Sequence, residues 1–378
     1  MKKSPKKILI MALVGKQNIG DEYILKSEYT YLKEKYPDTK FTIVTFDITS
    51  TPIVDKKNVS YISYFPNNLK KHPLKNIYFF LKQSFEIMRN DLIVVGGGGI
   101  FFDNEPNINF KKLIRQWKLR LSLARFFRKK ICFFGISLEI KSSTHLRQLR
   151  QIISKKDLVL VRNQKSKEML LEIGVNSKKI DDVVFLNRQT STKKCRTSTQ
   201  ENNKKIIGFS LRGGFFSLEN IQELKRSIKI LKEKNYEIIF LSHSLVGDKN
   251  TNDISFVEDI FGKEKYIITK SLEETEKMYE KIDIMVSMRF HSTILSAMGK
   301  IPCVILSYGP KTDALISDFD ANNISLQVKN FSSEDFLSKI YYVFDNYQKE
   351  QEKISKIYQE KHIKLLQKLE KIDIMGES

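Results

Sequence analysis

Residues 282–292 read IDIMVSMRFHS, and this segment decides the fold class. Its first half is apolar and β-branched, as expected of a buried strand, and helix-forming residues follow without a loop between them. A buried strand that runs directly into a helix is typical of the strand–helix repeats that build parallel sheets. Arg289 and His291 fall in the turn between the two elements. The segment therefore predicts an α/β fold with charged side chains at the carboxyl end of a strand.

The same alternation of strand and helix patterns extends along most of the chain. It predicts a parallel sheet in each half, because strands separated by helices form right-handed crossover units. The expected strands are 8–14, 41–46, 59–64, 91–95, 130–134, 157–161, 206–211, 237–242, 266–269, 282–286 and 303–308. One expected helix begins at residue 21, and the others span 74–89, 109–127, 142–154, 217–234, 251–262, 272–280 and 291–299.

Two doubly wound Rossmann-like domains facing a cleft are the architecture that this order predicts. We expect an N-terminal α/β domain at 1–187, a C-terminal α/β domain at 206–345 and a helical tail at 346–378. Residues 188–205 are polar and lack apolar periodicity, which indicates a linker. Ligands of such sheets bind at the carboxyl ends of the strands.

Composition excludes several classes of protein. The 378 residues are 41% hydrophobic and 29% charged, which is typical of a globular chain and allows two to three domains. No apolar run approaches the ~18 residues of a spanning helix, and the basic N-terminus has no cleavage-site pattern, so we expect a cytoplasmic protein. The chain has three cysteines far apart in sequence, Cys132, Cys195 and Cys303, and this spacing fits neither a disulfide framework nor a zinc site. We therefore expect no bound metal.

The chain is strongly basic, with 65 Lys and Arg against 44 Asp and Glu, a formal charge of +21. Such a charge attracts nucleic acid, anionic membranes or anionic substrates. A genome biased toward Lys and Ile would produce much of the same charge without any function. Charge alone therefore leaves the partner open.

Two glycine-containing segments of the first domain are candidate binding loops. Asn18, Gly20, Asp21 and Glu22 follow the first strand and open a helix, where glycine permits close backbone approach and Asp21 can cap the helix. Gly96–Gly99 follow a buried strand, and four glycines there indicate that something approaches the backbone closely. A plain strand-to-helix turn explains the first segment equally well.

Other candidate residues follow the ends of several strands, all in the second domain except Arg162, which lies in the first. Arg212 follows the first strand of the second domain, where its fork of donors can meet a phosphate or carboxylate. Arg289 and His291 combine a permanent cation and a titratable acid at a helix N-terminus, which favours an anion. Further candidates at strand ends or in the following turns are Arg162, Ser210, His243, Ser292, Ser307, Tyr308 and Lys311.

The ordered set of these motifs resembles the polysaccharide pyruvyl transferase family over about residues 8 to 320. The segments that carry the resemblance are NIGDE at 18–22, the glycine run 96–99, GIS at 135–137, VR at 161–162 with Ser166 and Gly174, SLR at 210–212, MRFH at 288–291 and SYGPK at 307–311. The resemblance implies a fold similar to that of the two-domain glycosyltransferases of the B type.

The resemblance also implies a reaction, in which phosphoenolpyruvate donates its enolpyruvyl carbons to two hydroxyls of a sugar as a ketal. Arg212 and Arg289 match the family's donor-binding arginines and His291 its catalytic histidine, here expected as the general acid. We expect the two arginines to clamp the donor from opposite domains, with the acceptor on the N-terminal side and no cofactor. The acceptor would belong to a cell-surface polysaccharide, such as a capsule, or to its lipid-diphosphate-linked precursor.

Two other functions remain open from the sequence. One is a nucleotide-sugar glycosyltransferase of the same fold. Many retaining members carry paired glutamates in the second domain, whereas no glutamate occurs between Glu280 and Glu334. The other is a nonenzymatic nucleic-acid-binding protein, which the charge favours but for which no recognition motif is present, so we expect no nucleic-acid partner.

Residues 109–130 form a predicted helix with many cations. Leu113, Trp117, Leu121 and Ala124 are expected to face the sheet. The basic face, with Arg120, Arg125 and Arg128 and the nearby Lys70, Lys71 and His72, is either merely solvated or rests on anionic lipid. The second interpretation predicts peripheral association with the inner face of a membrane.

Overall fold

The computed structural model describes residues 4–48, 55, 57–64, 73–103, 109–189, 204–245, 252–262, 266–269 and 271–375. Contacts divide the chain into two compact units. Unit 1 comprises residues 1–16, 21–186 and 364–378, and unit 2 comprises 17–20 and 187–363. Both units are therefore discontinuous in sequence, since a four-residue segment near the N-terminus belongs to unit 2.

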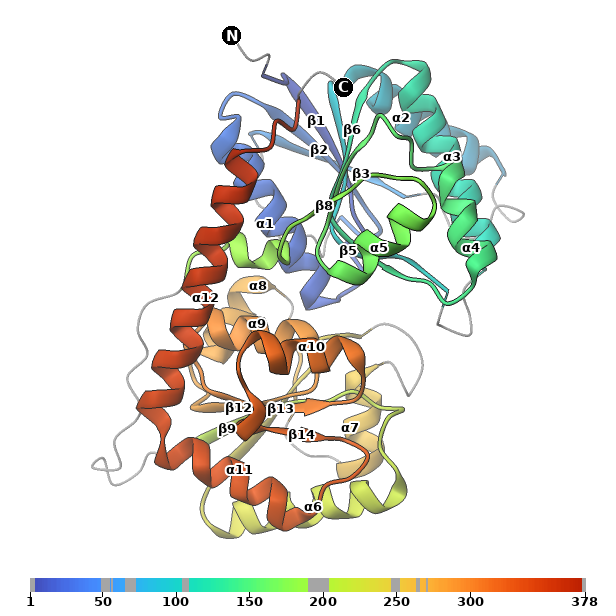
Figure 1. The fold of residues 1–378 in the computed structure, drawn as a ribbon. Helices are drawn as coiled ribbons and strands as arrows, with labels where there is room; N and C mark the ends of the chain where they lie inside the picture. The colour runs from blue at the N-terminus through green and yellow to red at the C-terminus, as the bar shows by residue number, and fades with distance from the viewer. Residues whose placement is uncertain are drawn as a thin grey trace. The chain divides into compact units, whose positions relative to one another are not determined.

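Unit 1 contains a parallel sheet with the strand order β3-β2-β1-β4-β6-β7-β8, and β5 pairs with β6 (Figure 1). Most of its central strands are buried, apolar segments, which is typical of a parallel sheet covered on both faces. Its strands are β1 (Lys7–Met11), β2 (Lys40–Thr45), β3 (Val59–Ser63), β4 (Leu92–Val95), β5 (Gly98–Phe102), β6 (Lys130–Glu139), β7 (Leu158–Val161) and β8 (Lys178–Lys179).

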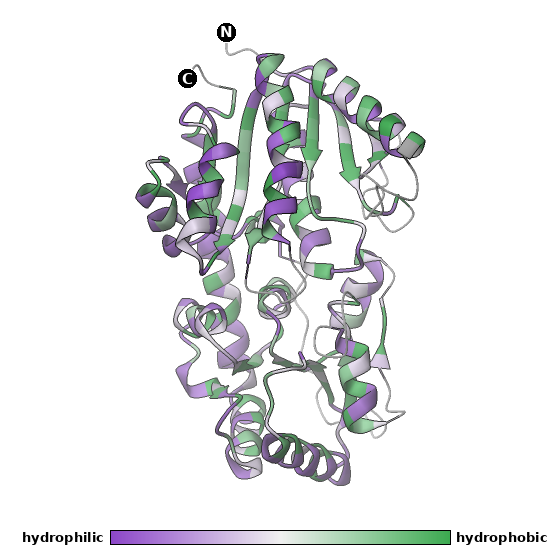
Figure 2. Ribbon diagram, turned by 90° about the vertical axis from the view of Figure 1, so that its right-hand side faces the viewer, coloured by the Kyte–Doolittle hydropathy of each residue, from purple (hydrophilic) through white to green (hydrophobic). Residues whose placement is uncertain are grey.

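One face of this sheet carries the main apolar core of unit 1, to which α2, α3, η1 and α5 contribute buried side chains. Figure 2 shows the strands beneath them as largely apolar. The helices of unit 1 are α1 (Ile19–Lys35), α2 (Pro73–Arg89), α3 (Phe110–Phe126), α4 (Ser143–Gln148), η1 (Leu149–Gln151), α5 (Gln164–Glu172) and η2 (Val183–Leu186).

Unit 2 contains a six-stranded parallel sheet with the order β11-β10-β9-β12-β13-β14. In chain order this is 3-2-1-4-5-6, the doubly wound order in which the direction of winding reverses between β9 and β12. Its strands are β9 (Ile206–Ser210), β10 (Glu237–Leu241), β11 (Tyr266–Ile267), β12 (Ile284–Ser287), β13 (Cys303–Ser307) and β14 (Ser325–Gln327).

Seven helices and one short 3-10 turn accompany the described part of this second sheet. They are α6 (Leu218–Glu233), α7 (Asp253–Phe261), α8 (Leu272–Tyr279), α9 (Phe290–Met298), α10 (Pro310–Asp318), η3 (Asn322–Ile324), α11 (Ser333–Asp345) and α12 (Tyr347–Glu370). The boundary between the units falls within α12, whose Tyr358 is buried in unit 2 and whose Leu365 and Leu369 are buried in unit 1.

The predicted α/β class with two doubly wound sheets is confirmed, and most predicted elements match observed ones within a few residues. β5, β8, β14 and α5 were not expected, and β6 extends five residues beyond the predicted 130–134. Most of the predicted linker, from residue 190 to 203, lies outside the described residues and includes Cys195. Cys132 and Cys303 are free and buried, and burial raises the pKa of the Cys303 thiol to about 12.

The expectation that Arg120 is a surface cation is wrong. Its side chain is buried between α2 and α3, where Nε donates to the Gln83 side chain at 3.0 Å and the guanidinium lies over the ring of Tyr64. Arg125 is tied to the Asp157 carboxylate. Trp117, Leu121 and Ala124 are buried toward the sheet as expected. Lys70, Lys71 and His72 lie outside the described residues.

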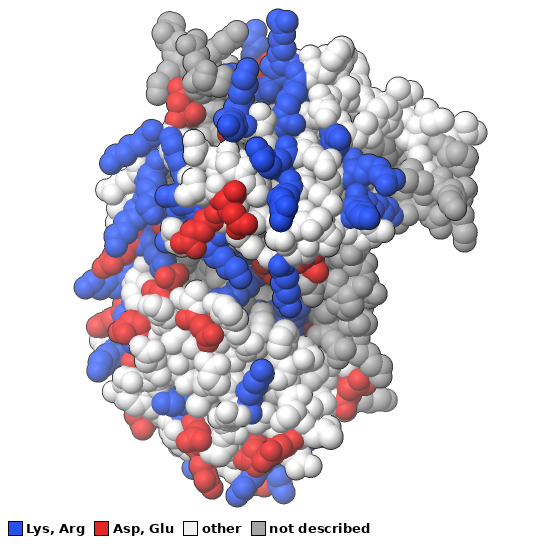
Figure 3. All heavy atoms as spheres, turned by 45° about the vertical axis from the view of Figure 1, so that its right-hand side comes forward, with Lys and Arg blue, Asp and Glu red and all other residues white. Residues whose placement is uncertain are grey.

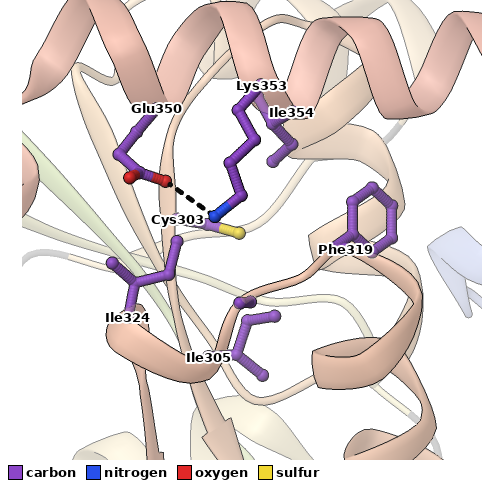
Figure 4. A pocket seen from close by; sticks show the side chains of 8 residues that line it. Cys303, Ile305, Phe319, Ile324, Glu350, Lys353 and Ile354 are labelled. Atoms are coloured by element: carbon purple, nitrogen blue, oxygen red, sulfur yellow. Dashed lines mark ion pairs between the residues drawn. The ribbon is translucent and has the colours of Figure 1, made fainter.

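A small cavity of about 10 Å³ lies beneath α12 in unit 2, with room for about one water molecule. It is lined by Cys303, Ile305, Phe319, Ala321, Ile324, Glu350, Lys353 and Ile354. Figure 4 shows the Lys353 ammonium directed toward the buried Glu350 carboxylate, 3.5 Å away. Cys303 lies at the amino end of β13, whereas the candidate site residues follow the carboxyl end of that strand. The cavity is therefore separate from the candidate site and lies where α12 packs on the sheet.

Candidate functional site

The carboxyl ends of four neighbouring strands in unit 2 carry most of the expected site residues. The strands β10, β9, β12 and β13 are consecutive in the sheet, and they are followed by His243, Arg212, Arg289 with His291, and Tyr308, respectively. The reversal of winding falls between β9 and β12, where doubly wound sheets bind their ligands. The residues predicted from the sequence to bind substrate or act in catalysis therefore lie beside this reversal point.

Parallel pairing brings the two arginine segments together. Ser287 pairs with Ser210, and the Met288 N–H donates to the Ser210 carbonyl at 2.9 Å. The Arg212 N–H contacts the Met288 sulfur at 3.2 Å. The expectation that the arginines come from opposite domains is wrong, because Arg212 and Arg289 both belong to unit 2 and follow adjacent strands.

Arg212 is held by aromatic rings and not by a carboxylate. Its guanidinium lies 5.3 Å from the ring centroid of Phe215 and 5.8 Å from that of Tyr308, and these two rings pack against one another. Nη1 is 3.5 Å from the Tyr308 hydroxyl. Nε is buried and has no hydrogen-bond partner among the described residues. Arg212 therefore presents a preorganised cation without a counter-ion in the described part of the chain.

Arg289 is positioned by a buried carboxylate that sequence reasoning missed. The guanidinium donates to Oδ1 of Asp253, from Nε at 3.1 Å and also from Nη2. Asp253 also accepts the N–H groups of His243 and Ser244 through Oδ2. Burial raises the pKa of Asp253, and the Arg289 guanidinium opposes that shift. Arg289 thus stands at the N-cap of α9 with its side-chain orientation fixed by α7.

His243 is a buried, neutral histidine. Its Nδ1 lies 2.8 Å from the Ser210 hydroxyl, and its Nε2 lies 2.7 Å from the hydroxyl of Tyr279. Burial lowers its pKa to about 3. Both ring nitrogens contact protein groups and the side chain is buried, so the substrate contact expected from the sequence stays a prediction.

His291 lies in the first turn of α9, against the backbone of Gly20. A Cβ built on Gly20 would overlap Nδ1 of His291, so only glycine fits there without displacing the imidazole. The Ile19 N–H donates to the His243 carbonyl at 3.0 Å, and Asn18 forms an antiparallel bridge with Ser244. Residues 17–20 therefore belong to the same site as His291, although they are about 270 residues away in sequence.

The serine hydroxyls at this edge bond within the protein. Ser292 lies beside the Ser287 hydroxyl and donates to the Arg289 carbonyl, which stabilises the turn into α9. Ser307 bonds to Thr312 and Asp313 of α10. Lys311 is exposed, with its ammonium 5.7 Å from the Phe290 ring centroid.

The glycine run in unit 1 accommodates a side chain of the protein itself. Gly96 and Gly97 lie against the carboxyl group of Glu28 on α1, to which the Gly97 N–H donates. A Cβ on Gly96 would lie 2.7 Å from Glu28 Oε2. Gly98 and Gly99 begin β5. The close approach expected from the sequence is therefore present, but the approaching group is Glu28, whose pKa is raised well above its ordinary value by complete burial.

The other expected residues of unit 1 have separate environments. Asp21 and Glu22 form the first turn of α1, and Glu22 Oε1 accepts the Gly15 N–H at 2.7 Å. Burial raises the pKa of Glu22 to about 8. Arg162 is buried in an ion pair with Asp182 at 2.8 Å, an arrangement that supports the fold of unit 1. In the parts of the chain described above, no three His, Cys, Asp or Glu residues cluster as metal ligands would.

Solved structures identify the class of fold. The chain is similar to HepE from Anabaena in complex with UDP, with a TM-score of 0.59 and 13% identity, covering 96% of this chain and 98% of HepE. It is also similar to the UDP-bound S. aureus MnaA, with a TM-score of 0.56, 12% identity and coverage of 93% and 91%. A putative UDP-N-acetylglucosamine 2-epimerase from Listeria monocytogenes has a TM-score of 0.56 at 11% identity, with 98% of both chains covered. These similarities establish the two-domain, glycosyltransferase-B-like fold.

Sequence comparison identifies the family. Residues 18–310 match the polysaccharide pyruvyl transferase family, so this chain belongs to that family and is a transferase. No curated protein matches the chain. The resemblance inferred from the ordered motifs is thereby confirmed.

The raised pKa of Glu22 predicts a pH-dependent effect of Glu22→Gln. Between the ordinary value of 4.5 and about 8, the folded protein keeps the proton that the unfolded chain has lost. Stability contributed by Glu22 is therefore present at low pH and is lost as the pH rises through this window. Glutamine retains the acceptor for the Gly15 N–H but does not titrate. We expect the melting temperature of Glu22→Gln to rise, relative to wild type, between pH 5 and pH 8.

Thermal denaturation at several pH values measures this effect. Glu172→Gln, which changes an exposed residue of α5 in the same unit, is the matched control. A difference between Glu22→Gln and wild type that stays constant from pH 5 to pH 8 would contradict the assignment.

Proposed function

We propose that this transferase moves the pyruvyl group of phosphoenolpyruvate onto two hydroxyls of one sugar, forming a cyclic ketal and releasing phosphate. The acceptor sugar belongs to a cell-surface polysaccharide or to its lipid-linked precursor, and the reaction takes place on the cytoplasmic side of the membrane. Membership of the pyruvyl transferase family supports this proposal. The observation that carries it is the group of two arginines and a histidine at the point where the sheet of unit 2 reverses.

The charges of the site suit this donor. Phosphoenolpyruvate carries a carboxylate and a phosphate, and an arginine fork binds either group through two parallel hydrogen bonds. Arg212 has no carboxylate partner among the described residues, and Arg289 lies beside it at the end of the adjacent strand, oriented by Asp253. The N-terminus of α9 adds a favourable dipole for an anion, and no side chain caps it.

His291 is the proposed general acid. His243 is neutral at physiological pH and is hydrogen-bonded within the protein, so His291 is the histidine of this edge that can exchange a proton with a substrate. A bound anionic donor favours the protonated imidazole beside it. His291 would then donate its proton to the methylene carbon of the donor and later recover one from a sugar hydroxyl.

The atoms balance over two additions at one carbon. Protonation of the methylene carbon produces a methyl group and an electron-poor centre at the neighbouring carbon. The oxygen of the first sugar hydroxyl bonds to that carbon and loses its proton. The second hydroxyl oxygen then bonds to the same carbon while the bond from that carbon to the phosphate oxygen breaks, and the proton of this hydroxyl passes to the departing phosphate. Hydrogen phosphate leaves and the ketal closes.

Phosphate release from phosphoenolpyruvate, measured against a panel of free and lipid-linked glycans, tests the proposed donor and acceptor. Mass spectrometry of the glycan should show one added pyruvyl group per phosphate released. Transfer of a sugar from a nucleotide sugar, with no phosphate released from phosphoenolpyruvate, would instead establish a glycosyltransferase.

His291→Gln should retain the fold and donor binding but lose turnover by about 10²- to 10⁴-fold, because it removes a general acid. His362→Gln on α12 is the matched control. Turnover of His291→Gln within a few-fold of wild type would remove His291 from the mechanism.

Arg212→Ala should weaken phosphoenolpyruvate binding about tenfold or more, since charged hydrogen bonds are lost. Arg212→Lys should not restore it, because an ammonium cannot reproduce the planar fork or its stacking on Phe215 and Tyr308. Titration calorimetry measures the affinity, with the exposed Arg226→Ala on α6 as control. Unchanged affinity in Arg212→Ala would exclude Arg212 from donor binding.

Gly20→Ala should reduce turnover by displacing the imidazole of His291, since the added methyl group overlaps Nδ1. A double-mutant cycle isolates this effect, because the same substitution should cost little in a His291→Ala background, where the ring is absent. If Gly20→Ala reduces turnover by the same factor in wild type and in His291→Ala, its effect does not depend on the His291 imidazole.

A further inference from the structure

Helix α2 presents an apolar stripe to solvent. Its large hydrophobic side chains Leu74, Ile77, Tyr78, Leu81, Phe85 and Met88 are between 42% and 81% exposed. Their spacing of three, one, three, four and three residues places them on one face of the helix. Scattered exposed apolar residues are ordinary, but a continuous stripe on one helix is not, and such patches mark interaction sites.

The opposite face of α2 is buried and carries several polar residues beside Ile87. Asn76 and Gln83 are nearly inaccessible, and Gln83 bonds to the Ser63 carbonyl of β3 and to Arg120 of α3. The inner face of α2 therefore combines amide groups with Ile87, which lies in the apolar core, while six large hydrophobic side chains point outward. Burial of one face does not account for this outward stripe. Figure 2 shows α2 as a largely hydrophobic ribbon at the edge of unit 1.

Cations border this stripe on the adjacent helix. α3 contacts α2 through the Arg120–Gln83 hydrogen bond and exposes Lys111, Lys112, Arg115 and Lys118. Together the two helices contain nine Lys and Arg and one acidic residue. That residue, Glu86, is buried and paired with Arg89. Figure 3 shows Lys and Arg side chains gathered on unit 1 beside a region of uncharged surface.

We propose that α2 and α3 form a membrane-docking surface, in which the α2 stripe enters the boundary between headgroups and acyl chains of an anionic bilayer. The described part of the chain contains no helix long and apolar enough to cross a membrane, so this contact is interfacial. Amphipathic helices with aromatic and aliphatic groups on one face bind in this way. Each flanking cation near an anionic surface adds about 1 kcal/mol.

The positive charge of this surface favours an anionic lipid bilayer over a second copy of the chain as its binding partner. A second copy of the chain would bring two surfaces of the same sign together, within molecules that each carry a formal charge of +21. An anionic bilayer offers both an apolar interior for the stripe and opposite charges for the α3 cations. Docking is independent of the proposed reaction, because none of the candidate site residues lies on α2 or α3.

Cosedimentation of the full chain with vesicles tests this proposal. Binding to vesicles that contain phosphatidylglycerol should exceed binding to pure phosphatidylcholine and should fall with salt. Ile77→Ser/Leu81→Ser should reduce partitioning about tenfold or more, because two inserted side chains are lost. The matched control is Leu171→Ser/Leu218→Ser, which removes two leucines of α5 and α6 that are more exposed than Ile77 and Leu81. Lys111→Glu/Lys118→Glu should reduce binding at low salt, whereas Lys225→Glu/Arg226→Glu on α6 should not.

A fluorescent reporter distinguishes insertion from surface attraction. The chain has a single tryptophan, Trp117, which is buried. Phe85→Trp adds one on the stripe, and its emission should be quenched by lipids brominated on their acyl chains, whereas Leu218→Trp should not respond. Three results would overturn the proposal: no binding of wild type to anionic vesicles at low salt, full binding by Ile77→Ser/Leu81→Ser, or a dimer in sedimentation velocity that this variant abolishes.

Discussion

The parallel pairing of β9 with β12 is the constraint on which the site depends. Because Ser210 and Ser287 are in register, the two strands end together, and Arg212 and Arg289 leave the sheet side by side in the fold. The neighbouring pairings of β10 with β9 and of β12 with β13 then add His243 and Tyr308 to the same edge. A one-residue slip in any of these pairs would reverse the direction of the side chains that follow.

The two arginines of this edge are held in electrically different ways. Arg289 is paired with a buried carboxylate, so much of its charge is already compensated. Arg212 is held by the faces of two aromatic rings, which orient a guanidinium but do not neutralise it. The positive potential of the edge therefore comes mainly from Arg212 and the helix terminus. We therefore expect an anionic ligand of this edge to gain more from Arg212 than from Arg289.

Much of the fold was predictable because buried parallel strands are short, continuous apolar runs that stand out between helical patterns. The residues following these strands were predictable for the same reason, since the end of a strand locates its side chain at the edge of a sheet. Arg212, Arg289, His291 and Tyr308 were found in this way. Their roles in binding and catalysis remain predictions.

What escaped sequence reasoning depends on long-range packing. Asp253 begins an ordinary helix, and only the tertiary fold directs its carboxylate to Arg289. The glycine run indicated a close approach but not that Glu28 of α1 makes it. The burial of Arg120 was predicted wrongly and the α2 stripe was not predicted. In both cases helical periodicity identifies an apolar face but does not show which face the rest of the protein covers. The short strand β5 was missed because its apolar residues directly follow a glycine run that was interpreted as a loop, and β14 was missed because its three residues include a single apolar one.

The discontinuity of both units has a consequence for synthesis on the ribosome. Leu365 and Leu369 complete the core of unit 1, and the Leu369 carbonyl accepts hydrogen bonds from Tyr31 and Lys35. Unit 1 therefore cannot finish folding as it emerges, although nearly all of its residues are made first, and it must wait for about 180 further residues that include unit 2. A nascent chain would keep part of the α1 surface uncovered during this interval, when chaperones can bind it. Translation that stops before residue 364 would leave this surface uncovered permanently.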